Sequence, residues 1–118
     1  MTGKVTLYHN PRCSKSRATL ELLRERGIEP TIVEYLKTPP SQAEIARLLD
    51  MLGMEARELM RSKETEYREQ ALDNPGLKPK DLIKAMHDTP KLIERPIVVA
   101  NGKAALGRPP EQVLEILI

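Results

Sequence analysis

The sequence predicts an α/β protein with a mixed sheet, in which a βαβ unit and a ββα unit are separated by a helical region. A β-rich segment, a helix-forming segment and a second β-rich segment occupy the chain up to Leu36. Helical patterns follow over about residues 40–90, and a β-hairpin signal with a last helix ends the chain. With 118 residues, 40% of them apolar, we expect a single domain with its own core.

The first unit is predicted from three consecutive patterns. Residues 4–8 are β-rich, residues 14–26 carry leucines on a helix-forming background, and Gly27 is a helix stop. Residues 31–36 form the second β-rich segment, after Pro30. A helix of this length between two strands is typical of a parallel βαβ connection.

The helical region begins after the Thr-Pro-Pro segment at residues 38–40. Ser41 and Glu44 form a capping-box signature for a helix with an apolar face at i, i+3, i+4 and i+7. That face consists of Ile45, Leu48, Leu49 and Leu52. Shorter helices are expected around residues 55–60, 64–72 and 79–86, with a turn at 73–76.

The second unit is a predicted hairpin and helix. Residues 97–100 are an apolar strand, Asn101-Gly102 is a strong signal for a two-residue turn, and residues 103–106 can return antiparallel. A last helix is expected after residues 107–110. Its apolar positions, expected to pack on the sheet, are Val113, Leu114, Ile116 and Leu117.

Composition argues against several classes of function. The net charge is only +2, Trp and Phe are absent and the three tyrosines are scattered, which disfavours a nucleic-acid binder. No run approaches the roughly 18 apolar residues of a membrane span, and the polar start has no signal-peptide core, so we expect a cytoplasmic protein. The single cysteine excludes an internal disulfide and a zinc cluster of cysteines, so a redox cycle needs an external thiol.

Cys13 lies where the first predicted strand leads into the first predicted helix. The unpaired N–H groups and dipole of a helix N-terminus favour negative charge, and so do Arg12, Lys15 and Arg17 close by in the sequence, with His9 upstream. We therefore expect the pKa of Cys13 to lie below the ordinary value of about 8.5. The same features suit an incoming oxyanion. The alternatives are that Cys13 is a buried apolar filler, His9 an ordinary loop histidine and the cations a solvated helix face.

The segment HNPRCSKSR resembles the active-site loop of the glutaredoxin-coupled arsenate reductase family. The match extends through Glu94-Arg95-Pro96 and Gly107-Arg108-Pro109, and small bacterial members are the most similar. Their larger relatives continue further at the C-terminus, which leaves the physiological oxyanion open. The resemblance implies a thioredoxin-like fold with an inserted helical region, which agrees with the predicted order of elements.

Residue by residue, the resemblance implies that Cys13 is the nucleophile and that His9 helps to keep its sulfur ionised. Ser16 and Arg17 match positions in the same loop. Arg61, Arg95 and Arg108 match the three arginines that hold the oxyanion, and the bond from Arg95 to Pro96 is expected to be cis. Each arginine, and Arg61 above all, could instead be an ordinary surface charge.

The implied activity is reduction of arsenate to arsenite, with glutathione as co-substrate, glutaredoxin as partner and no bound metal or flavin. A monothiol glutathione-dependent oxidoreductase is one alternative. An Spx-like regulator that binds RNA polymerase is another, although the Cys-x-x-Cys of its redox-sensing members is here Cys13 to Ser16. The phosphatase-like class of arsenate reductases needs Cys-x5-Arg and further cysteines, but Thr19 stands at the arginine position.

Overall fold

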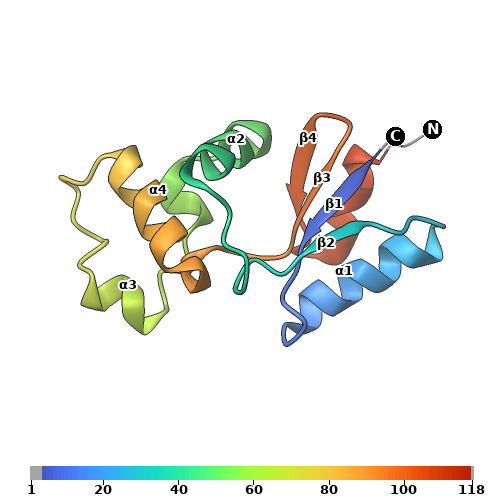
Figure 1. The fold of residues 1–118 in the computed structure, drawn as a ribbon, viewed down its shortest axis with the longest axis horizontal. Coiled ribbons are helices and arrows are strands. Elements are labelled where there is room, and N and C mark those ends of the chain that lie inside the picture. The colour runs from blue at the N-terminus through green and yellow to red at the C-terminus, as the bar shows by residue number, and fades with distance from the viewer. Residues whose placement is uncertain (1–3, 118) are drawn as a thin grey trace. The chain divides into compact units, whose positions relative to one another are not determined.

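The computed structural model describes residues 4–117 and divides them between two units. The first combines residues 4–38 with residues 95–117 and contains all four strands of the sheet (Figure 1). The second, Pro39–Glu94, is built from helices and short 3-10 turns. The boundaries lie close to those of the expected helical region.

The sheet of the first unit is mixed, as predicted. Its strands are β1 (Val5–Tyr8), β2 (Thr31–Val33), β3 (Ile97–Ala100) and β4 (Lys103–Leu106), in the order β2-β1-β3-β4. β1 pairs parallel with β2 and antiparallel with β3, and β3 pairs antiparallel with β4. The Asn101-Gly102 turn closes the β3–β4 hairpin with positive φ at both residues, 56° and 73°.

β2 is shorter than the sequence predicted. The pairing of β1 with β2 ends at Tyr8 and Val33, and the chain turns at once, with the Lys37 N–H donating to the Glu34 carbonyl at 2.9 Å. A strand continues only where a neighbour offers backbone partners. The predicted segment 31–36 is therefore a strand in its first half and a turn in its second.

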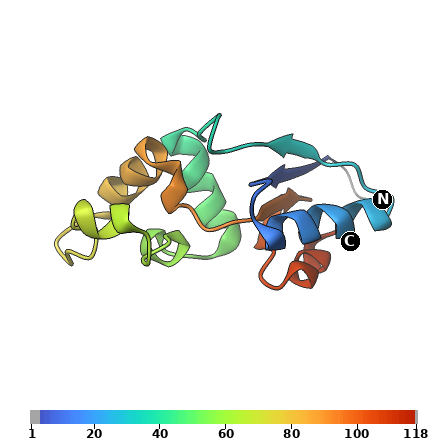
Figure 2. The same cartoon turned by 90° about the horizontal axis from the view of Figure 1, so that it is seen from below.

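One face of the sheet is covered by α1 (Ser14–Glu25) and η3 (Pro110–Ile116), which lie on the same side in Figure 2. The last helix predicted from the sequence is present, but as a 3-10 helix. Alternate residues of the strands meet the two helices in a buried core. This core consists of Val5, Leu7, Leu23, Val98, Ala100, Ala105, Val113 and Ile116.

The second unit begins with α2 (Gln42–Leu52). The Ser41 hydroxyl accepts the N–H of Glu44 at 3.1 Å, which is the predicted N-cap bond, and Gly53 ends the helix in the left-handed conformation. α2 packs against α4, and its buried positions are Ile45, Leu48 and Leu49. The other elements are η1 (Ala56–Leu59), α3 (Thr65–Glu69), α4 (Pro79–Asp88) and η2 (Pro90–Leu92).

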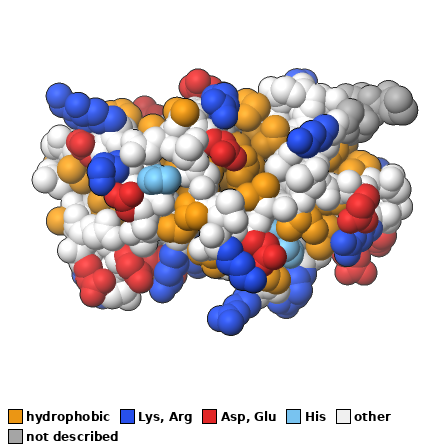
Figure 3. Space-filling model, viewed as in Figure 1, with side chains coloured by type: hydrophobic (Ala, Val, Ile, Leu, Met, Phe, Trp, Pro, Cys, Tyr) orange, Lys and Arg blue, Asp and Glu red, His pale blue; other side chains and the backbone are white. Residues whose placement is uncertain are grey.

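The surface carries both signs of charge. Basic and acidic side chains are interspersed on the face drawn in Figure 3, in keeping with the small net charge of +2. Across residues 4–117, no helix is both long and apolar enough to cross a bilayer.

Candidate active site

Cys13 is the N-cap residue of α1. Its backbone is extended, with φ −92° and ψ 124°, its carbonyl accepts the N–H of Arg17 at 3.0 Å, and its own N–H donates to the Asn10 carbonyl at 3.0 Å. The residue is 8% exposed. The thiol therefore lies at the N-terminus of a twelve-residue helix, as predicted, and belongs to a buried residue.

The pKa of the Cys13 thiol lies below its ordinary value because four influences outweigh burial. Burial is the largest single effect and raises the pKa; the Ser16 N–H, the charge of Arg95, the Lys15 N–H and the charge of Arg108 lower it. The two N–H groups belong to the first turn of the helix, where N–H groups have no carbonyl partner within the helix. The balance increases the thiolate fraction at neutral pH, and thiolate is the reactive form.

Ser16 links this helical turn to His9. The Ser16 hydroxyl lies 2.6 Å from His9 Nδ1 and accepts the N–H of Asn10 at 3.0 Å. Ser16 is completely buried and His9 is 7% exposed. The main chain of His9 is held as well, because its N–H donates to the Val33 carbonyl at 2.9 Å.

The imidazole of His9 is favoured in its neutral form. Burial lowers the pKa of His9 most strongly; Glu34 raises it, and the charges of Arg24 and Arg17 lower it further, so the net pKa lies below the ordinary value. A neutral imidazole has one ring nitrogen that accepts a hydrogen bond and one that donates. His9 therefore serves the loop as a hydrogen-bonding partner of Ser16 rather than as a cation.

Arg95 precedes β3 and Arg108 follows β4, so both lie at the open end of the β3–β4 hairpin. In the sheet register, Tyr8 pairs with Ile97 and Ile97 pairs with Leu106, so the chain leaves the sheet at one edge in three places. The segments at this edge are the loop to Cys13, the approach to β3 that carries Arg95, and the exit from β4 that carries Arg108. Residues 95 and 108, remote in sequence from residue 13, meet it for this reason.

The two arginines are also joined to each other. Arg108 Nε donates to the Arg95 carbonyl at 2.8 Å, and the Gly107 N–H donates to the Pro96 carbonyl at 2.9 Å. Both arginines are half-buried residues. The bond from Arg95 to Pro96 is cis, as the resemblance implied, and the bond from Arg108 to Pro109 is cis as well, which the sequence did not indicate.

Arg12 and Arg17 are nearer to Cys13 in sequence but are exposed. Arg17 donates to the Pro11 carbonyl at 2.9 Å, and the Arg12 N–H donates to Asn10 Oδ1 at 3.0 Å, so both help to shape the loop. The charges that lower the pKa of Cys13 are those of the distant arginines. Asn10 was not singled out from the sequence, although an asparagine in a tight loop is a common signal for such bonds.

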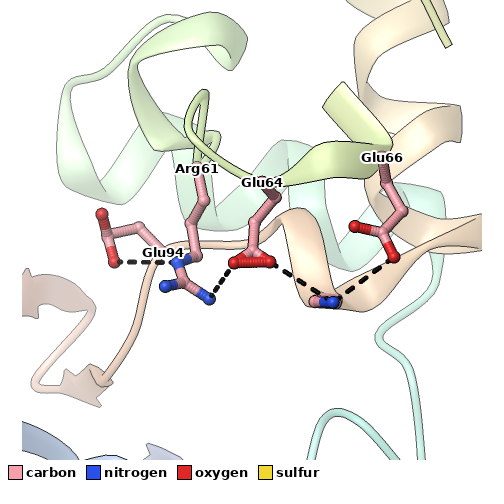
Figure 4. A network of polar contacts seen from close by, with 5 residues as sticks. Arg61, Glu64, Glu66 and Glu94 are labelled. Atoms are coloured by element: carbon pink, nitrogen blue, oxygen red, sulfur yellow. Dashed lines mark hydrogen bonds and ion pairs between the residues drawn. The ribbon is translucent and has the colours of Figure 1, made fainter. Parts of the chain in front are cut away.

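Arg61 belongs to the second unit, where it forms part of an ionic network (Figure 4). Its Nη1 lies 3.3 Å from Glu64 Oε1 and its Nε lies 3.9 Å from Glu94 Oε1, while its N–H donates to the Leu92 carbonyl at 2.7 Å. Lys91 extends the network from Glu64, at 3.5 Å. The residues that the structure brings together around Cys13 are therefore those of the first unit: His9, Ser16, Arg95 and Arg108.

Within the described residues, no three His, Cys, Asp or Glu side chains gather in a way that could hold a metal ion. The first unit offers an ionisable thiol, N–H groups of a helix N-terminus and two arginines, a combination suited to holding and attacking a small anion.

Comparison with known proteins gives concordant matches. The model of the ArsC family matches residues 8–116. The chain is 62% identical to "Uncharacterized protein YfgD" of Escherichia coli (strain K12), over 99% of each chain. It is 51% identical to "Arsenate reductase" of Neisseria meningitidis serogroup A, over 97% of this chain and 98% of the relative. The solved "Arsenate reductase from Vibrio cholerae" superimposes with a TM-score of 0.95 at 56% identity, over 97% of this chain and 98% of that one.

Proposed function

This chain belongs to the ArsC family of the thioredoxin superfamily, and we propose that it reduces arsenate to arsenite with Cys13 as the nucleophile. One observation carries the proposal. The guanidinium groups of Arg95 and Arg108 act on a thiol whose pKa is already lowered by N–H groups of a helix N-terminus. Relatives that share 45–51% identity with this chain are named arsenate reductase, and these names suggest arsenate as the substrate.

The first step is attack by the Cys13 thiolate on arsenic(V). Arsenate is a tetrahedral anion, so a thiolate meets it only if its charge is compensated. Arg95 and Arg108 provide charged donors for its oxygens, and the helix N–H groups add neutral ones. An arsenic–sulfur bond then forms, and one oxygen leaves as hydroxide or water after protonation.

Reduction of arsenic(V) is completed by a thiol from outside the chain. With one cysteine in 118 residues, a second thiol has to be supplied, and glutathione is the donor that the family resemblance suggests. The glutathione thiolate attacks the Cys13 sulfur of the adduct, so that a sulfur–sulfur bond forms and the arsenic–sulfur bond breaks. The electron pair of the broken bond stays on arsenic, which departs as arsenite and leaves a mixed disulfide. Glutaredoxin then reduces the mixed disulfide and restores Cys13. The cycle requires a reducing compartment such as the cytoplasm.

The other residues of the loop have supporting roles in this proposal. His9 and Ser16 hold the turn whose N–H groups face the thiol, through the contact between His9 Nδ1 and the Ser16 hydroxyl. Arg12 and Arg17 hold the loop through Asn10 and Pro11. Pro96 sets the backbone after Arg95.

Arg61 is the third oxyanion ligand that the resemblance implies. Its guanidinium pairs with Glu64 and Glu94 within the second unit, so its charge is partly compensated there. We keep Arg61 in the proposal as a contributor whose effect has to be measured separately from that of Arg95 and Arg108.

The test is arsenite formation by the purified protein, with glutathione and glutaredoxin both present and with each left out. We expect turnover that needs both donors, is abolished in Cys13→Ser and is retained in Ser14→Ala, a matched change at an exposed neighbour. Reduction of glutathionylated proteins without arsenate turnover would favour the monothiol oxidoreductase. Inactivity in both assays, together with capture of RNA polymerase subunits, would favour the regulator.

A further inference from the structure

Gly107 directly precedes Arg108, is hydrogen-bonded to the residue after Arg95, and has no room for a side chain. A Cβ at this position would lie 2.7 Å from Pro96 Cγ and closer still to Thr19 Oγ1. Its φ is outside the left-handed range, in contrast to Gly27, Gly53 and Gly102. Glycine is therefore required here for space and not for backbone conformation.

The contacts of Gly107 join three segments. Its N–H donates to the Pro96 carbonyl, which attaches it to the strand after Arg95. The next residue, Arg108, donates from Nε to the Arg95 carbonyl. Thr19 borders the same space that a Cβ of Gly107 would take; it is completely buried on α1, and its hydroxyl donates to the Lys15 carbonyl at 2.8 Å.

We propose that Gly107 is a positioning residue, which sets how closely the helix that carries Cys13 approaches the segments that carry Arg95 and Arg108. The proposal rests on the function given above, in which these three residues act on one oxyanion. Thr19 and Pro96 are the two residues whose side chains limit this approach, and neither side chain can swing away. Thr19 is β-branched and buried in a helix, and Pro96 is a ring.

The consequence of adding one methyl group follows from the contacts. Ordinary van der Waals separation between carbon atoms is about 3.5–4.0 Å, so the contact with Pro96 and the contact with Thr19 each have to open by roughly 1 Å. Displacements of about 1 Å in a catalytic site can lower rates by roughly 10²-fold. The guanidinium groups would move away from the thiol while each residue of the site kept its identity.

The charged groups that act on Cys13 are Arg95 and Arg108, and burial and helix N–H groups account for the rest of its pKa shift. A wider spacing weakens the contribution of the arginines and leaves that of the helix. The pH dependence of Cys13 alkylation therefore measures the spacing directly, without any arsenate turnover.

The experiment compares Gly107→Ala with Gly102→Ala in the full chain. Gly102 lies in the same unit, has φ +73° and has nothing within 4 Å of an added Cβ, so its alanine variant strains the backbone without pressing on the site. For Gly107→Ala we expect a higher alkylation midpoint for Cys13, weaker protection of the thiol by arsenate, and arsenate kcat/KM lowered by roughly 10²-fold. For Gly102→Ala we expect lower stability with an unchanged midpoint.

A double variant, Gly107→Ala with Thr19→Ala, removes the closest of the clashing atoms and is expected to recover part of the midpoint shift, since the Pro96 contact persists. If Gly107→Ala fails to fold, the double variant serves instead, with Thr19→Ala alone as its reference, because both lack the hydroxyl that donates to the Lys15 carbonyl. A folded Gly107→Ala protein with the wild-type midpoint overturns the proposal, as does a double variant with the same midpoint as Thr19→Ala alone. A wild-type protein that forms no arsenite refutes the proposed function but leaves the midpoint comparison valid.

Discussion

Replacement of Ser16 by alanine separates two contributions of this residue to the site. The hydroxyl connects His9 Nδ1, at 2.6 Å, to the N–H of Asn10, at 3.0 Å, while the backbone N–H lowers the pKa of Cys13. Ser16→Ala removes the first contribution and retains the second. We therefore expect a loss of stability without a loss of thiolate.

The size of the loss follows from what is left unsatisfied. The ring nitrogen of His9 is buried and loses its partner, which costs about 1–3 kcal/mol. The Asn10 N–H belongs to a half-buried residue, and losing its bond adds about 0.5–1.5 kcal/mol. The total of about 1.5–4.5 kcal/mol is a large part of the 5–15 kcal/mol typical of a domain, yet most domains would still fold.

The assay is urea unfolding at pH 7, followed by far-UV circular dichroism because the chain has no tryptophan. Ser14→Ala is the matched control, since Ser14 lies in the same first turn of α1 and is exposed. Alkylation of Cys13 across pH measures the thiolate in the same proteins. Equal stability of the two alanine variants would refute the bridging role of the hydroxyl. A clear rise in the alkylation midpoint of Ser16→Ala would contradict this separation, because it would show that the thiolate also depends on the hydroxyl.

Three further predictions concern charge. Arg95→Ala removes a cation that lowers the pKa of Cys13, so the alkylation midpoint should move to higher pH and arsenate kcat/KM should fall by roughly 10²-fold. The control Arg47→Ala, at an exposed residue, should change neither, and equal effects of the two variants would contradict the role given to Arg95. The folded-state pKa of His9 lies below the ordinary value of about 6.5, so as the pH falls from 7 toward 5 the unfolded chain binds a proton at His9 before the folded protein does, and the wild type loses stability. His9→Gln should reduce this loss in urea titrations, and parallel stability curves for the two proteins would contradict the prediction. Arg61→Ala breaks partly exposed ion pairs and should lower the free energy of unfolding by about 1 kcal/mol or less. A large fall in arsenate turnover would therefore indicate a role in catalysis, and unchanged turnover would remove Arg61 from the oxyanion site.

The elements that sequence patterns located well are those stabilised by local signals. Ser41 caps α2 through the N–H of Glu44, as predicted, and Asn101-Gly102 closes the predicted hairpin. Helix caps and two-residue turns depend on bonds between residues a few positions apart, which the sequence states directly. The predicted strand 31–36 failed in its second half because β2 ends where its pairing with β1 ends.

By itself, the sequence determined that one thiol stands where a helix begins, because residue order fixes its place, and that these 118 residues hold no second thiol. The tertiary structure decided which cations act on that thiol. Arg12 and Arg17 are near in sequence but exposed, whereas the register of β1, β3 and β4 carries Arg95 and Arg108 to the sheet edge from which the Cys13 loop departs. Strand register depends on pairing between distant segments, and the space at Gly107 depends on how a helix packs against that edge. Neither is written in any local pattern, because both are set by contacts between residues far apart in the chain.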